Sequence, residues 1–92
     1  MRAILCKEYG PAETLVIEDV TSPVVKGHGV KVRVKAAGLN FPDTLIIEGK
    51  YQLKPTMPFS PGGEMSGEVI EVGEKVTRFK PGDRVAGLTG YG

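Results

Sequence analysis

The stretch that decides the fold is Val30-Lys31-Val32-Arg33-Val34-Lys35-Ala36-Ala37-Gly38-Leu39-Asn40-Phe41-Pro42-Asp43. Its first part alternates, with one side taking the apolar residues Val30, Val32, Val34 and Ala36 and the other taking the basic residues Lys31, Arg33 and Lys35. Successive side chains of a β-strand point to opposite faces, so a strand is predicted over residues 30–39, with one face on a core and the other in water. The basic residues are then a solvated strand face, and a polyanion site is the less favoured interpretation.

The second part of this stretch changes character and predicts a short helix between Phe41 and Glu48. Asn40 is a suitable N-cap, and proline is tolerated in a first turn because its missing N–H has no partner there. Asp43 lies near the positive end of the helix dipole. Gly49 suits the exit from the helix.

Outside this stretch, four further segments have strand character and are separated by glycine and proline corners. They are residues 2–7, 15–20, 64–72 and 84–88, and the chain carries 13 glycines and 7 prolines. About six short strands and one short helix are expected in total. The pattern predicts a mainly β fold, a partly open β-barrel.

Length and composition exclude several classes of protein. Ninety-two residues with 40% hydrophobic and 25% charged side chains make one folded domain. A formal net charge of +1 gives no electrostatic case for binding nucleic acid or a membrane surface. One cysteine and no apolar run near 18 residues lead us to expect a cytoplasmic protein.

Several segments, taken together and in order, resemble one family. They are Val32 to Asp43, Gly49-Lys50-Tyr51, Pro61-Gly62-Gly63-Glu64, Gly67 to Gly73, and Phe79-Lys80-Pro81-Gly82-Asp83-Arg84-Val85. The chain is similar to the N-terminal, GroES-like domain of zinc-less quinone oxidoreductases, within the medium-chain dehydrogenase/reductase (alcohol dehydrogenase-like) superfamily. The resemblance covers residues 1–92. It implies a GroES-like, substrate-side domain with a partly open barrel.

The resemblance also implies a second domain of Rossmann type, which binds NAD(P)H. That fold needs a G-x-G-x-x-G turn between a strand and a helix. Residues 87–92 have glycines in another order, so we expect the Rossmann domain to be absent from this chain and the chain to be inactive alone.

Zinc-dependent members of the superfamily carry a cysteine after an Ala-Ala-Gly-x stretch and a histidine in a Gly-His-Glu triplet. The matching positions here are Asn40 and Gly63, and Glu64 remains. Catalytic zinc takes three protein ligands. Cys6 and His28 lie elsewhere in the sequence and are interpreted as a core residue and a solvated loop residue. We therefore expect no zinc and no other metal.

Without zinc to polarise an oxygen, the hydride acceptor has to be electron-poor already. The resemblance implies NADPH-dependent reduction of a quinone or an activated α,β-unsaturated carbonyl. Asn40 and Tyr51 are the catalytic candidates, and Asn40 and Asp43 the cofactor-binding ones. Asn40 would donate to a substrate oxygen or the nicotinamide ribose; a plain helix N-cap is the alternative. Tyr51 would give a proton or hydrogen bond, or else pack as an aromatic wall.

Other roles stay open at this stage. Asp43 would support Asn40 or the loop around it, unless it only stabilises the first helical turn. Glu64 is expected to accept a hydrogen bond rather than act as an acid. Phe41 and Phe59 are candidates for either the cleft wall or the core.

Two other functions compete with a quinone reductase. One is an enoyl-thioester or alkenal reductase domain, and the other is a GroES-like binding module without redox chemistry. In isolation the chain is expected to expose the apolar face that its missing half would cover, and so to self-associate.

Overall fold

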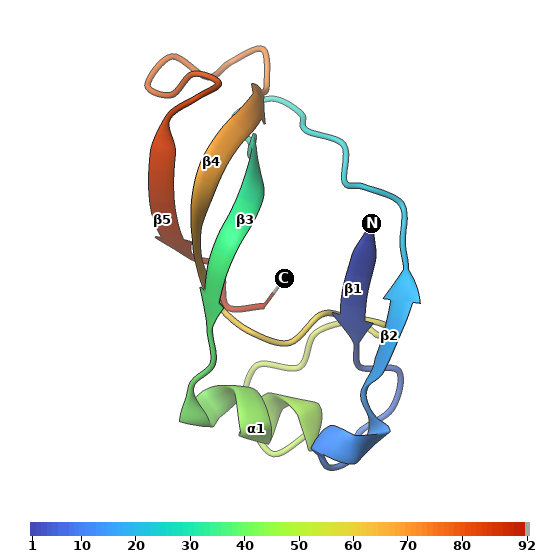
Figure 1. The fold of residues 1–92 in the computed structure, drawn as a ribbon. Helices are drawn as coiled ribbons and strands as arrows, with labels where there is room; N and C mark the ends of the chain where they lie inside the picture. The colour runs from blue at the N-terminus through green and yellow to red at the C-terminus, as the bar shows by residue number, and fades with distance from the viewer. Residues whose placement is uncertain (92) are drawn as a thin grey trace. The chain divides into compact units, whose positions relative to one another are not determined.

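The computed structural model describes residues 1–91 (Figure 1). The strands, in chain order, are β1 (Arg2–Leu5), β2 (Val16–Asp19), β3 (Val30–Gly38), β4 (Glu64–Val72) and β5 (Arg84–Leu88). The helices are a 3-10 turn, η1 (Ala12–Thr14), and one α-helix, α1 (Phe41–Ile47). A mainly β fold with one short α-helix is thus confirmed. Five strands form in residues 1–91 rather than about six, and η1 was not expected.

The strands form two open sheets. One has two strands in the order β1-β2, and the other has three in the order β3-β4-β5. The contacts divide the chain into two compact units. The first unit contains residues 1–21, 38–64 and 89–91, and the second contains residues 22–37 and 65–88.

The first unit holds the larger core. β1 and β2 pair antiparallel, with Arg2 opposite Asp19 and Leu5 opposite Val16. Directly after β1, Cys6 forms a bridge with Phe59, with N···O distances of 2.8 and 3.2 Å. The buried cluster comprises Cys6, Ile46, Ile47 and Phe59. The helix therefore packs its apolar side onto the end of the two-stranded sheet.

The ends of α1 follow the signals in the sequence. Asn40 has extended backbone angles at the N-cap, and proline and Asp43 occupy the first turn. The backbone turns away at Gly49, whose φ of +71° is readily adopted only by a residue without a Cβ. The predicted helix is confirmed, one residue shorter at its C-terminus because Glu48 is the C-cap.

The second unit is the three-stranded sheet. β3 and β4 run in opposite directions, and β4 lies between its two neighbours (Figure 1). Val69 in β4 is fully buried, and its backbone exchanges 2.8 Å hydrogen bonds with Gly82 and Asp83. Residues 39–63 leave this sheet at the end of β3 and return at the start of β4, and they contain α1.

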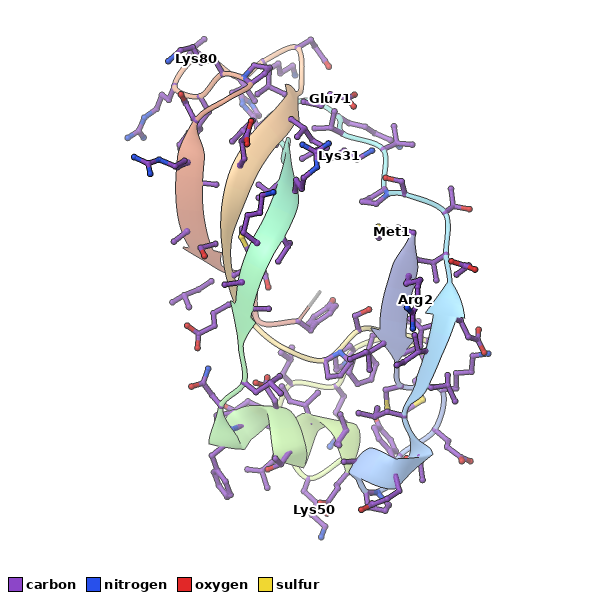
Figure 2. All side chains as sticks on the ribbon, in the orientation of Figure 1. Met1, Arg2, Lys31, Lys50, Glu71 and Lys80 are labelled. Carbon is purple, nitrogen blue, oxygen red and sulfur yellow. The ribbon has the colours of Figure 1, made fainter. Side chains whose placement is uncertain are left out.

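The burial predicted for β3 is wrong. Val30, Val34 and Ala36 are exposed, Val34 at 55% of its surface, and Val32 is only half-buried. Of the basic residues, Arg33 and Lys35 are exposed as expected. Figure 2 shows Lys31 of β3 and Glu71 of β4 at the same end of the sheet. The alternation of side chains is as predicted, but three of the four apolar residues on that face of the strand are exposed.

Candidate functional site

Three polar side chains lie close together where β3 leads into α1: Asn40, Asp43 and Glu64. Asn40 is the N-cap of α1, and Asp43 is the third residue of the helix. Glu64 is the first residue of β4. All three belong to the first compact unit. Two of these residues were candidates from the sequence, and the third was expected only as an acceptor.

The backbone nitrogen and the side-chain nitrogen of Asn40 each donate a hydrogen bond to a carboxylate. The Asp43 carboxylate accepts a hydrogen bond from the backbone N–H of Asn40 at 2.8 Å, in the arrangement of a capping box. The side-chain Nδ2 of Asn40 donates to Oε1 of Glu64. The Asn40 side chain is therefore more than a helix cap, because its amide nitrogen binds a residue from another element.

Asp43 is buried, with 9% of its surface exposed, and Asn40 is exposed. Burial of a carboxylate is favourable only when its oxygens find donors, and the Asn40 backbone supplies one. The expectation that Asp43 supports Asn40 thus has a structural basis in this contact.

Gly38 lies two residues before Asn40 and Gly63 directly before Glu64, and both glycines are crowded. A Cβ on Gly38 would lie 2.8 Å from the carboxylate carbon and Oε1 of Glu64. A Cβ on Gly63 would lie 2.9 Å from the carbonyl oxygen of Gly90. Gly63 also accepts a hydrogen bond from the backbone N–H of Thr89 at 2.7 Å. Residues 89 and 90 therefore close over position 63 and leave no room there for a side chain.

A cavity of about 130 Å³ lies beside the helix N-terminus. Its lining residues are Ala12, Leu15, Leu39, Asn40, Asp43, Thr44, Ile47 and Pro61. The exposed wall is almost entirely apolar, which suits the apolar part of a small ligand.

Tyr51 is not among the residues that line this cavity. Its ring is half-buried and packs against the Cys6–Phe59 core cluster, and its backbone carbonyl accepts a 3.0 Å hydrogen bond from Lys54 Nζ. The structure brings Asn40, Asp43 and Glu64 together and places Tyr51 on the core. Its proposed contact with substrate stays a prediction.

The two phenylalanine candidates also differ in burial. Phe59 is 4% exposed and belongs to the core, where its ring meets Tyr91 edge-on with centroids 6.2 Å apart. Phe41 is 73% exposed at the start of α1. Of the two, only Phe41 is accessible to a ligand or another domain.

The remaining candidate metal ligands do not gather at this site. Cys6 is fully buried, and its Sγ lies 3.2 Å from the carbonyl oxygen of Glu8. Burial raises the pKa of the Cys6 thiol. His28 lies in the second unit, in a shallow hollow with Lys75 and Arg78. Within residues 1–91, no three His, Cys, Asp or Glu side chains are arranged to hold a metal ion, and no helix is long and apolar enough to cross a membrane.

Comparison with known proteins agrees with this architecture. Residues 26–91 match the family model of the alcohol dehydrogenase GroES-like domain. The chain belongs to this family. The GroES-like chain is 51% identical over 92 residues to a quinone oxidoreductase-like protein 2 homolog from Nematostella vectensis, covering 99% of this chain and 25% of that protein. It is 40% identical over 86 residues to a human quinone oxidoreductase, covering 92% of this chain and 26% of that protein.

Solved structures give the same result. A quinone oxidoreductase from Pseudomonas syringae has a TM-score of 0.88 and 40% identity, over 97% of this GroES-like chain and 28% of its own. Escherichia coli quinone oxidoreductase, solved in complex with NADPH, has a TM-score of 0.84 and 36% identity, over 94% and 26% of the two chains. The GroES-like chain therefore spans about a quarter of the length of the curated relatives it matches.

Proposed function

We propose that the chain is the substrate-side domain of a zinc-independent, NAD(P)H-dependent oxidoreductase that transfers hydride to a quinone or an activated α,β-unsaturated carbonyl. The names of its relatives support this assignment, and so does the NADPH complex of the Escherichia coli enzyme. In this proposal the hydride donor is bound by a Rossmann domain with a G-x-G-x-x-G turn, a motif that the 92-residue sequence does not contain.

The proposal rests on the residues at positions 40 and 63, which stand beside Glu64 where the zinc branch has metal ligands. The zinc branch needs a cysteine at position 40 and a histidine at position 63, and this chain has Asn40 and Gly63. The amide nitrogen of Asn40 carries hydrogens and already donates one to Glu64, so it offers no lone pair to a metal. The Gly90 backbone occupies the space that a histidine at position 63 would need. These residues do not fit a catalytic zinc ion.

Because these residues do not fit a zinc ion, the chemistry that we propose needs no Lewis acid at this position. A quinone or an enone accepts hydride because conjugation spreads the incoming negative charge, whereas a simple ketone needs its oxygen polarised. Bound NADPH would supply the hydride. The part that this chain plays is to orient the acceptor, and Asn40 is placed to do so beside a mostly apolar wall. Such a wall also keeps water away from the reacting atoms.

The test uses a polypeptide in which this chain is followed by a Rossmann domain. We expect it to oxidise NADPH with 1,4-benzoquinone, at a rate that dialysis against a chelator leaves unchanged, and without one equivalent of zinc by elemental analysis. The 92-residue chain alone, assayed in parallel, should show no turnover. One equivalent of bound zinc together with oxidation of simple alcohols would refute the proposal.

The same assay separates the other functions. A faster rate with an enoyl thioester than with 1,4-benzoquinone would indicate the enoyl-thioester reductase instead. No NADPH oxidation with either acceptor would favour a binding module.

A further inference from the structure

We infer that Glu64 is a positioning residue for Asn40, and that Gly38 is required because it leaves room for the Glu64 carboxylate. The inference rests on the proposed function, in which Asn40 contacts the bound ligand. It adds the two residues that set the direction of that contact. The observations are the hydrogen bond from Asn40 Nδ2 to Glu64 Oε1 and the space above Gly38.

The chemistry of the pair allows one orientation of the amide. An ionised carboxylate only accepts hydrogen bonds, whereas an asparagine amide has a donor end and an acceptor end. With Glu64 present, the NH2 group has to face the carboxylate, because a flipped amide would place two acceptors against each other. Glu64 therefore selects one of the two amide orientations that asparagine otherwise has.

This orientation matches the ligand class proposed above. The amide nitrogen carries two hydrogens, and one of them is directed at Glu64. The second is left to donate to an acceptor atom, and a quinone or enone offers a carbonyl oxygen. Since the Asn40 side chain is exposed, this hydrogen is open to a ligand. The Asp43 bond to the backbone N–H fixes the other end of the residue, so only the side-chain torsions depend on Glu64.

Gly38 provides the clearance that the pair needs. Its φ is not positive, so the backbone conformation itself would accept alanine. An alanine methyl would lie 2.8 Å from the Glu64 carboxylate, closer than real Cβ contacts. The group that it meets is the far end of a flexible side chain, so Glu64 is expected to move while the fold stays intact. Gly38→Ala is thus a way to displace Glu64 without removing it.

The hydrogen bond is tested first by NMR on the 92-residue chain. Asn40 is its single asparagine, so labelling asparagine with 15N in the side-chain amide gives one NH2 group. We expect Glu64→Ala and Gly38→Ala to shift its resonances toward those of a free amide. Glu64→Gln keeps an acceptor oxygen and should keep the two protons distinct. Glu68→Ala is the matched control, because Glu68 is also a half-buried glutamate of β4 but lies in the other unit. Melting temperatures measured alongside verify folding.

The role in catalysis is tested in the two-domain polypeptide. Glu64→Ala should lower kcat/KM for 1,4-benzoquinone by about tenfold, as expected when one charge-assisted hydrogen bond is lost. Glu64→Gln should stay within about threefold of the wild type, since it preserves an acceptor of the same shape. Gly38→Ala should resemble Glu64→Ala. The double variant should be no worse than Glu64→Ala, because both changes act on one bond.

The outcomes separate this inference from the proposed function. An active enzyme in which Glu64→Ala keeps wild-type kcat/KM, or an Asn40 amide that does not respond to Glu64→Ala, would overturn the positioning role. Additive losses in the double variant would overturn the role of Gly38. A wild-type enzyme that reduces neither quinones nor enones would refute the proposed function itself, and with it the ligand contact of Asn40, whatever the NMR spectrum shows.

Discussion

Replacing Gly67 with alanine should strongly destabilise the three-stranded sheet. Gly67 is buried in β4, and a Cβ built on it would lie 2.1 Å from the backbone carbonyl oxygen of Arg33 in β3. Real Cβ atoms essentially never approach a heavy atom more closely than 3.0 Å. The obstacle is backbone rather than a movable side chain, so β3 and β4 have to separate for the methyl group to fit.

The expected loss in free energy of unfolding follows from how deeply the added methyl group overlaps the Arg33 carbonyl oxygen. Widening the contact from 2.1 Å to 3.0 Å moves two hydrogen-bonded strands apart by about 0.9 Å. That movement loses packing and weakens the ladder, and overpacking of this kind costs on the order of 3 kcal/mol. A chain of this length has a total stability of only about 5–10 kcal/mol. Since 1 kcal/mol shifts the melting temperature of such a domain by about 4–8 °C, Gly67→Ala should melt about 10–25 °C lower.

The assay is thermal unfolding of the 92-residue chain followed by circular dichroism. Gly87→Ala is the matched control, because Gly87 lies in β5 of the same sheet and a Cβ there would meet only the methyl of Met65, at 3.4 Å. That variant should melt within a few degrees of the wild type, or slightly above it, since alanine lowers the entropy of the unfolded chain. Equal melting temperatures for Gly67→Ala and the wild type would show that β3 and β4 do not approach this closely.

Two further predictions concern ionisable groups. Cys6 should react with iodoacetamide at pH 8 on the order of tenfold or more slowly in the folded chain than in 6 M guanidinium, because burial raises the pKa of its thiol and blocks access; equal rates would contradict its burial. Hydrogen bonds from Lys80, first from its Nζ and then from its backbone N–H, both at 3.1 Å, lower the pKa of Asp83 below its ordinary 3.8. A lowered folded-state pKa stabilises the fold above the unfolded value and is lost as pH falls through the folded value. The difference in melting temperature between wild type and Asp83→Asn should therefore be constant above about pH 5 and shrink below pH 3.8; a difference that grows on acidification would refute this.

The elements of this chain were predictable where the signal was local. The helix was correctly placed because Asn40, Pro42, Asp43 and Gly49 act within one or two turns of each other, and the structure has it at Phe41–Ile47. The strands at 64–72 and 84–88 were identified from branched residues between glycine and proline corners, and both bounds agree with the structure. What alternation in β3 did not reveal is whether a partner covers its apolar face.

The candidate site was less predictable, because its contacts join residues far apart in sequence. Asn40 and Glu64 are separated by 24 positions, and nothing in either segment indicates that their side chains meet. The approach of Gly90 to Gly63 is a backbone contact, and a glycine does not reveal in sequence which atoms surround it. Tyr51 was selected by motif alone, and its ring packs on the core.

Residues 39–63 leave the end of β3 and return at the start of the neighbouring strand β4. The residues of the candidate site can therefore change without changing how the strands pair. Long connections close at little extra entropic cost and tolerate substitution, so this connecting segment can be exchanged while the strands keep their pairing. To build a zinc-dependent variant, one would replace residues 39–63 as one piece with the matching segment of a zinc-dependent relative. The transplant would still fail unless the backbone at residues 89–90 were replaced too, because it fills the volume that the imported imidazole requires.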